Sequence, residues 1–81
     1  MRVHVKLFAQ LRDKIGAGDV GLELRDDATV NDVWQALVAA QPALAPFESS
    51  VSCAVNATYA RRHTRVKAGD EVAFLPPVSG G

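Results

Sequence analysis

The 81-residue sequence is poor in metal-binding and redox side chains: it has one cysteine, Cys53, and two histidines, His4 and His63. A single cysteine cannot form an internal disulfide or a cysteine-rich zinc site, so hydrophobic packing must stabilise the fold. Neither histidine has acidic or thiol ligands close to it in the sequence, and we therefore expect no metal site. Cys53 alternates with Val51 and Val55, which is typical of a buried thiol and not of a nucleophile.

The sequence also lacks an excess of charge and a long hydrophobic segment. Nine Lys and Arg residues balance nine Asp and Glu residues, so no global field favours nucleic acid. The longest uncharged stretches, 33–47 and 49–60, are too short to span a bilayer, and the alternating first residues lack the apolar segment of a signal peptide. We therefore expect a cytoplasmic protein with no nucleic-acid partner and no membrane partner.

Alternation of apolar and polar residues indicates several strands. Residues 2–8 alternate strictly and place Phe8, an aromatic residue, on the otherwise polar face. A short helical turn that ends at Gly16 is predicted over 9–16. Similar alternation predicts further strands over 20–24, 51–55, 59–61 and 71–75.

The strongest pattern is that of an amphipathic helix over 29–41. Thr29 is a favoured N-cap residue, and Asp32 follows at the position where an acidic side chain stabilises a helix N-terminus. Pro42 disfavours helical backbone at the residue before it and so ends the helix. The apolar stripe consists of Val30, Val33, Trp34, Leu37 and Val38. The element order predicts an α+β fold in which a mixed four- to five-stranded sheet packs on one main helix.

The segment after Leu75 begins with two conformationally restricted prolines and ends with two glycines, which have no side chains. The two prolines end sheet pairing, so we expect a folded domain over 1–75 and a flexible, extended tail over 76–81. Such a tail spans about 20 Å and fits a narrow channel. The carboxylate of Gly81 is ionised at pH 7 and a poor acyl electrophile. Chemistry there would need activation by another enzyme, most simply as an acyl-adenylate made from ATP.

Three segments carry a resemblance to a known family. They are Leu7-Phe-Ala-Gln-Leu-Arg12, Ala54-Val-Asn56 and Gly69-Asp-Glu-Val-Ala-Phe-Leu-Pro-Pro-Val-Ser-Gly-Gly81. With these segments the whole chain resembles the small, sulfur-carrier subunit of molybdopterin synthase, a β-grasp (ubiquitin-like) family. The resemblance implies that the strands over 2–8 and 71–75 are adjacent and parallel.

The resemblance also implies a function in molybdenum cofactor biosynthesis. An E1-like adenylyltransferase would use ATP to adenylate Gly81, and a sulfur donor protein would convert it to a thiocarboxylate. The tail would then insert into the large catalytic subunit of the synthase, in an expected heterotetramer, and deliver sulfur to cyclic pyranopterin monophosphate. The chain itself would bind no cofactor and would not be an enzyme on its own. The tail residues expected to insert are Pro76, Pro77, Val78, Ser79 and Gly80.

Hydrophobic residues on the sheet face away from the helix are candidates for partner docking. Period two places Phe8 and Leu75 there, with Tyr59 beside them, and the resemblance implies that these positions contact partner proteins. The basic run over 61–67, which has no acidic residue, borders this patch. It is either a solvated edge or a surface that steers an acidic partner. The candidate docking residues in this run are Arg61 and Arg62.

Other functions fit the same residues. The same carrier chemistry serves thiamine synthesis and the thiolation of tRNA. A ubiquitin-like protein modifier would instead form an isopeptide between Gly81 and a lysine, and a plain interaction module would have an inert tail. The chemical state of Gly81 distinguishes these alternatives.

Overall fold

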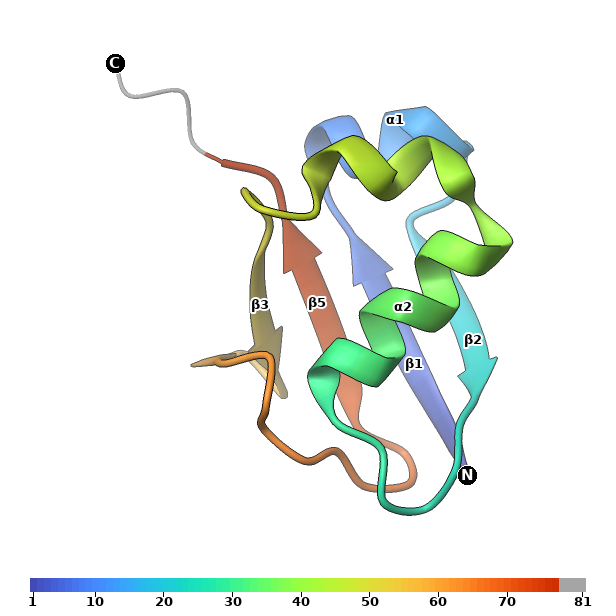
Figure 1. Ribbon diagram of the computed structural model, residues 1–81, viewed down its shortest axis with the longest axis vertical. Helices are drawn as coiled ribbons and strands as arrows, with labels where there is room; N and C mark the ends of the chain where they lie inside the picture. Colours follow the sequence, from blue (N-terminus) through green and yellow to red (C-terminus); the bar gives the residue numbers. More distant parts are fainter. Residues whose placement is uncertain (78–81) are drawn as a thin grey trace.

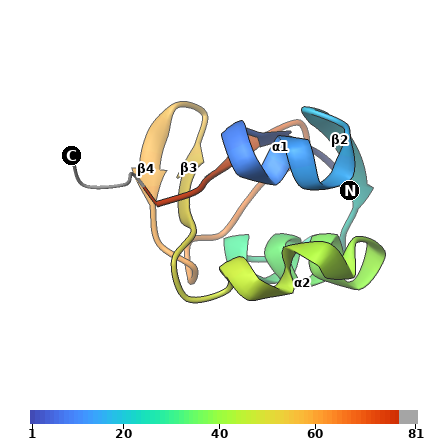
Figure 2. The same cartoon turned by 90° about the horizontal axis from the view of Figure 1, so that it is seen from above.

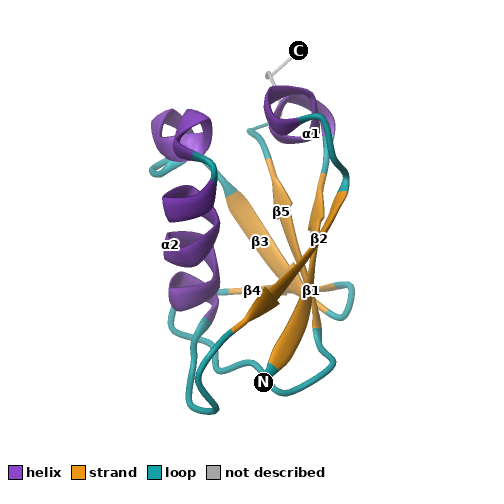
Figure 3. Cartoon of the chain, turned by 90° about the vertical axis from the view of Figure 1, so that its right-hand side faces the viewer, coloured by secondary structure: helices purple, strands orange, loops and turns teal. Residues whose placement is uncertain are grey.

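Eight elements follow one another in residues 1–77, which are the residues that the computed structural model describes. In chain order they are β1 (Arg2–Leu7), α1 (Ala9–Ile15), β2 (Asp19–Glu23), α2 (Val30–Ala40), the 3₁₀ helix η1 (Pro42–Phe47), β3 (Ser52–Val55), β4 (Thr58–Ala60) and β5 (Glu71–Leu75). The strands form one sheet, and α2 covers one of its faces (Figure 3). Helix α1 lies at the end of the sheet where β5 exits.

The first and last strands lie side by side within the sheet, whose order is β2-β1-β5-β3-β4 (Figure 1). β1 and β5 are parallel, with Val5 opposite Val72 and Leu7 opposite Phe74. The other neighbouring pairs are antiparallel. This topology confirms the predicted β-grasp fold and the parallel pairing of the terminal strands.

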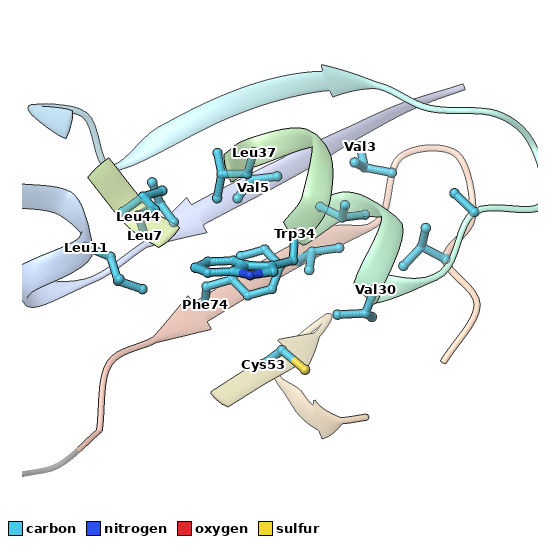
Figure 4. Packing of buried hydrophobic residues seen from close by; sticks show 14 residues of the cluster. Val3, Val5, Leu7, Leu11, Val30, Trp34, Leu37, Leu44, Cys53 and Phe74 are labelled. Carbon is cyan, nitrogen blue, oxygen red and sulfur yellow. The ribbon is translucent and has the colours of Figure 1, made fainter. Parts of the chain in front are cut away.

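The hydrophobic core lies between α2 and the sheet (Figure 4). Val5 and Val72, which face each other on β1 and β5, are fully buried, and so is Phe74. The buried ring of Trp34 on α2 packs on Phe74, with ring centroids 5.0 Å apart and planes inclined by 55°. Tilted aromatic pairs of this kind add to the stabilisation from burial. The Trp34–Phe74 contact therefore stabilises the packing of α2 on β5, a central strand of the sheet.

The N-terminus of α2 forms a capping box. The Thr29 hydroxyl accepts a hydrogen bond from the Asp32 N–H (3.3 Å), and the Asp32 carboxylate accepts one from the Thr29 N–H (2.9 Å). Two donors that the first turn of a helix leaves unpaired are thus satisfied. At the other end Gln41 is the C-cap residue, directly before Pro42, as the proline predicts.

Replacing Asp32 with asparagine is expected to lower stability at neutral pH by an amount that disappears in acid. The hydrogen bond from the Thr29 backbone N–H is the main cause that lowers the pKa of the Asp32 carboxyl below its usual range. A lowered folded-state pKa stabilises the protein above the unfolded-state pKa of about 3.9, and this stabilisation is lost as the pH falls through the folded-state value. Urea titrations from pH 7 down to about pH 2 measure the difference.

The control for this prediction is Thr29→Ala, which removes a cap hydroxyl that does not titrate. Its cost, about 1 kcal/mol, should fall only in part in acid: the hydrogen bond from the hydroxyl to the Asp32 carboxylate weakens on protonation, but the one it accepts from the Asp32 N–H remains. A difference between wild type and Asp32→Asn that stays constant down to about pH 2 would show that the carboxylate charge contributes nothing to the cap.

Some element boundaries differ from the sequence prediction. β1 ends at Leu7 because Phe8, although extended (φ −123°, ψ 154°), is the N-cap residue of α1. The connection after α2 is the 3₁₀ helix η1, which buries Leu44 and begins at Pro42, whose fixed φ suits a helical first position. β2 and β4 are each shifted one residue towards the N-terminus, and β3 starts one residue later than predicted.

Candidate functional site

A shallow groove lies on the face of the sheet opposite α2, with a volume of about 260 Å³. We call it the apolar groove. It is lined by Phe8, Ala54, Ala57, Tyr59, Glu71, Ala73 and Leu75. Most of these side chains are apolar and come from positions that alternate with the core residues of their strands, so the groove is a second hydrophobic surface of the same sheet.

The strand register explains how the groove forms. Ala54 on β3 lies opposite Ala73 of β5 on one side and opposite Tyr59 of β4 on the other. Two small side chains therefore form the floor, and larger ones rise around it. The aromatic side chains are accessible, because Phe8 is 44% exposed and Tyr59 is 79% exposed. The prediction that Phe8 is exposed on this face is confirmed.

Leu75 lines the groove but is half-buried, so the prediction that it is substantially exposed is wrong. The reason is that β5 pairs with β1 on one side and with β3 on the other, which leaves less of a side chain open to solvent. Pro76 is also half-buried and Pro77 is exposed, and the chain leaves the sheet beside the start of β3, where Leu75 lies opposite Ser52 (Figure 2). The remaining predicted tail residues lie outside the described residues: Val78, Ser79, Gly80 and Gly81.

The basic run over 61–67 divides into two kinds of residue. Arg61 is exposed, whereas the side chain of Arg62 is only 28% exposed. Arg62 Nη1 donates to Glu48 Oε2 (3.1 Å) and to Asn31 Oδ1 (2.9 Å), and its guanidinium lies 5.4 Å from the centroid of the Trp34 ring. These contacts place Arg62 on the α2 side of the sheet, away from the groove. Its predicted docking role stays a prediction.

A second hollow, of about 200 Å³, adjoins the groove at Phe8, which lines both. We call it the polar hollow. Its lining residues are Lys6, Leu7, Phe8, Arg12, Gly18 and Asp19. Sequence reasoning did not single out Arg12 or Gly18 as site residues. Arg12 belongs to the segment 7–12 that carries the family resemblance, but its neighbours in space come from the start of β2.

Reactive side chains are few in the described chain. Cys53 is buried, its thiol donates to the Ala60 carbonyl (3.1 Å), and desolvation raises the pKa of the thiol. A protonated, buried thiol is a poor nucleophile, and the prediction that Cys53 fills the core is confirmed. Within residues 1–77 no three His, Cys, Asp or Glu side chains are grouped as a metal site. In the same range none of the helices has the length and apolar character needed to cross a membrane.

Comparison with known proteins connects this fold to a family. Residues 5–81 match the model of the ThiS family. A molybdopterin synthase sulfur carrier subunit of Chlamydomonas reinhardtii is 37% identical over 83 residues, with 100% of both chains covered. Small archaeal modifier protein 1 of Haloferax volcanii is 38% identical, with 94% of this chain and 97% of that protein covered.

A solved structure agrees with the sequence matches. The crystal structure of SAMP1 from Haloferax volcanii has a TM-score of 0.91 and 36% identity, with 100% of both chains covered. The agreement extends over the whole length of the chain, in sequence and in fold. The chain therefore belongs to the ThiS family.

Proposed function

We propose that the protein is a sulfur carrier in molybdenum cofactor biosynthesis and that Gly81 carries the sulfur as a thiocarboxylate. The observation that carries this proposal is the match, over 100% of both chains, to a molybdopterin synthase sulfur carrier subunit. The fold supports it, because β5 leads directly from the centre of the sheet into Pro76 and Pro77. A rigid domain with a stiff exit presents the following residues to a partner at a defined place.

The chemistry begins with a carboxylate that is too poor an electrophile to react unaided. In the first step an oxygen of the Gly81 carboxylate attacks the α-phosphorus of ATP, and pyrophosphate leaves. The outer sulfur of a persulfide on the donor protein then attacks the acyl carbon and displaces AMP, which gives an acyl disulfide. A thiol cleaves the S–S bond of this intermediate, forms a disulfide with the donor cysteine and so releases the thiocarboxylate. In the large synthase subunit the thiocarboxylate sulfur attacks a carbon of the pterin substrate and displaces an oxygen leaving group, which gives a thioester. Water hydrolyses the C–S bond on the Gly81 side of this thioester, so the sulfur stays on the pterin and the carboxylate is restored. The chain supplies the sulfur, while partner proteins supply ATP binding and catalysis.

The apolar groove is the surface on which we propose that these partners dock. Phe8 and Tyr59 are large apolar side chains that remain accessible, and aromatic residues are typical anchors of protein interfaces. The floor of Ala54 and Ala73 leaves room for a side chain of the partner. The groove lies beside the exit of β5, so a protein bound there is close to the origin of the tail.

Mass spectrometry of protein purified from its own cells tests the proposal. Replacing one oxygen by sulfur adds about 16 Da, but so does oxidation of a methionine or cysteine. Cleavage after Lys67 separates the two cases, because residues 68–81 contain neither Met nor Cys. We expect the added mass in the 68–81 peptide and its disappearance in cells that lack the activating enzyme. A peptide that carries no added mass under any growth condition contradicts the proposal.

A second candidate function is favoured by one observation, the similarity to small archaeal modifier protein 1. A protein modifier forms an isopeptide bond between its terminal glycine and a lysine of another protein. In that case immunoblots of cell extracts show a ladder of larger conjugates, and digestion yields lysines that carry the C-terminal residues. The carrier function predicts the free thiocarboxylate form without a ladder.

A further inference from the structure

The polar hollow contains one cation whose charge is not compensated within the described chain. Lys6 Nζ lies 3.9 Å from Asp19 Oδ1 and 3.9 Å from Glu71 Oε2, so its charge is shared between two carboxylates. Arg12 is exposed and forms no ion pair with any Asp or Glu of residues 1–77. The hollow therefore has a guanidinium that is free to bind an anion, and a lysine that is not.

The first turn of α1 places Arg12 at the hollow, and its side chain lies against Gly18. The backbone N–H of Arg12 donates a hydrogen bond to the Phe8 carbonyl (3.5 Å). This bond connects the first turn of α1 to Phe8, the aromatic residue that lines both hollows. The side chain then lies over Gly18: a Cβ at Gly18 would be 3.3 Å from Arg12 Nε and 3.4 Å from Arg12 Cδ. The absence of a side chain at Gly18 leaves the space that the Arg12 side chain occupies.

We propose that the polar hollow binds a carboxylate, in which Arg12 pairs with an acidic side chain of the protein that docks on the apolar groove. Phe8 forms the boundary between the two hollows, so one bound protein covers both. The bound protein would place an apolar side chain in the apolar groove, over Ala54 and Ala73. On the other side of Phe8 it would place an Asp or Glu side chain in the polar hollow. A guanidinium matches a carboxylate in shape and pairs with it through two parallel hydrogen bonds.

This proposal rests on the proposed function for the identity of the partner, and it adds how the partner is selected. Apolar contact alone does not distinguish one hydrophobic surface from another, whereas a charge at the edge of the contact penalises partners that place a cation there. Arg12 is therefore a specificity-determining residue of the docking surface.

The test measures binding of the purified large subunit of molybdopterin synthase from the same organism by calorimetry at low and high ionic strength. The variants are Arg12→Gln, Gly18→Ala, Phe8→Asp and, as the matched control, Lys14→Gln. Lys14 is also an exposed cation of α1, but it does not line the hollow. Thermal unfolding of each variant is followed in parallel to show that the domain remains folded.

We expect Arg12→Gln to weaken binding about fivefold at low salt, the upper end for an exposed ion pair, with a smaller loss at high salt where charges are screened. Lys14→Gln should stay within about twofold of wild type. Gly18→Ala keeps every charge but shifts the Arg12 side chain by a few tenths of an ångström, and it should weaken binding by less than Arg12→Gln. Phe8→Asp should weaken binding most, because it places a charge in the apolar contact.

Equal losses of affinity for Arg12→Gln and Lys14→Gln overturn the proposal. The position of Arg12 in the hollow would then contribute no more to binding than any other positive charge on α1. An Arg12→Gln loss that does not depend on salt also overturns it. These results leave the proposed function intact as long as wild type binds and transfers sulfur. Wild-type protein that neither binds the large subunit nor transfers sulfur to the pterin contradicts the proposed function itself.

Discussion

Deletion of Gly81 is expected to abolish sulfur transfer while the domain stays folded. One residue of extended chain spans about 3.5 Å, so the shortened end would stop that far from the substrate. Reacting atoms must approach to about 3–3.5 Å, and a misplacement of about 1 Å already costs on the order of 100-fold in rate. The buried core is formed by residues from Val3 to Phe74, so its packing does not depend on Gly81. A residue added after Gly81 should have a comparable effect.

The measurement uses variants made chemically as thiocarboxylates, which bypasses the activating enzyme. Molybdopterin formation from cyclic pyranopterin monophosphate is then followed with the purified large subunit. The shortened protein in its carboxylate form is the control, and it should compete with the wild type because its apolar groove is unchanged. If the shortened thiocarboxylate makes molybdopterin at the normal rate, the length of the tail does not position the sulfur.

Replacement of Phe74 with alanine is expected to remove a large part of the stability of the domain. Phe74 is fully buried on β5 and packs on the Trp34 ring at 5.0 Å. Truncation of a buried phenylalanine costs about 3–5 kcal/mol, and the total for a small domain is about 5–15 kcal/mol. Urea denaturation monitored by Trp34 fluorescence measures the loss, because Trp34 is the one tryptophan of the sequence and the substitution retains it.

The matched control is the same substitution at Phe8. Phe8 is 44% exposed and lies on the opposite face of the sheet, so Phe8→Ala should cost less than about 1 kcal/mol. The midpoint for Phe74→Ala should fall by at least about 1 M urea, given slopes of about 1–3 kcal/mol per M. Similar losses at the two positions would mean that Phe8 belongs to the core and is not available to a partner.

Much of the fold follows from local patterns. The alternation in β1 and β5 assigns Phe74 to the core and Phe8 to the opposite face, and both assignments are confirmed. The bounds of α2 were predicted to within one residue at each end from its apolar stripe, from the N-cap residue Thr29 and from Pro42. These features depend on neighbours a few positions apart, so they are readable along the chain. η1 was missed because a short segment with two prolines has no helical period.

The features that sequence reasoning missed depend on contacts between distant segments. Arg62 belongs to a run of basic residues that resembles a solvated edge, but it binds Glu48, and no pattern in the run indicates that partner. Arg12 becomes part of a site only because β2 brings Gly18 and Asp19 next to it. The half-burial of Leu75 follows from the strand order, which sequence periodicity does not contain. The location of the apolar groove was predictable from the sequence, whereas the polar hollow beside it, with Arg12, was not.

The strand order also constrains when the protein can fold during synthesis on the ribosome. β1 is made first, but its parallel neighbour β5 is made last, and residues as far apart as His4 and Glu71 are paired. β3 also cannot complete its pairing until β5 has been made, because the two strands are neighbours in the sheet. Until β5 has emerged, the nascent chain contains two separate hairpins and a helix with no complete surface to cover, and such long-range pairing is slow. A translation product interrupted before β5 would remain unfolded and open to proteases, so a cell would accumulate folded domains only from chains that have passed residue 75.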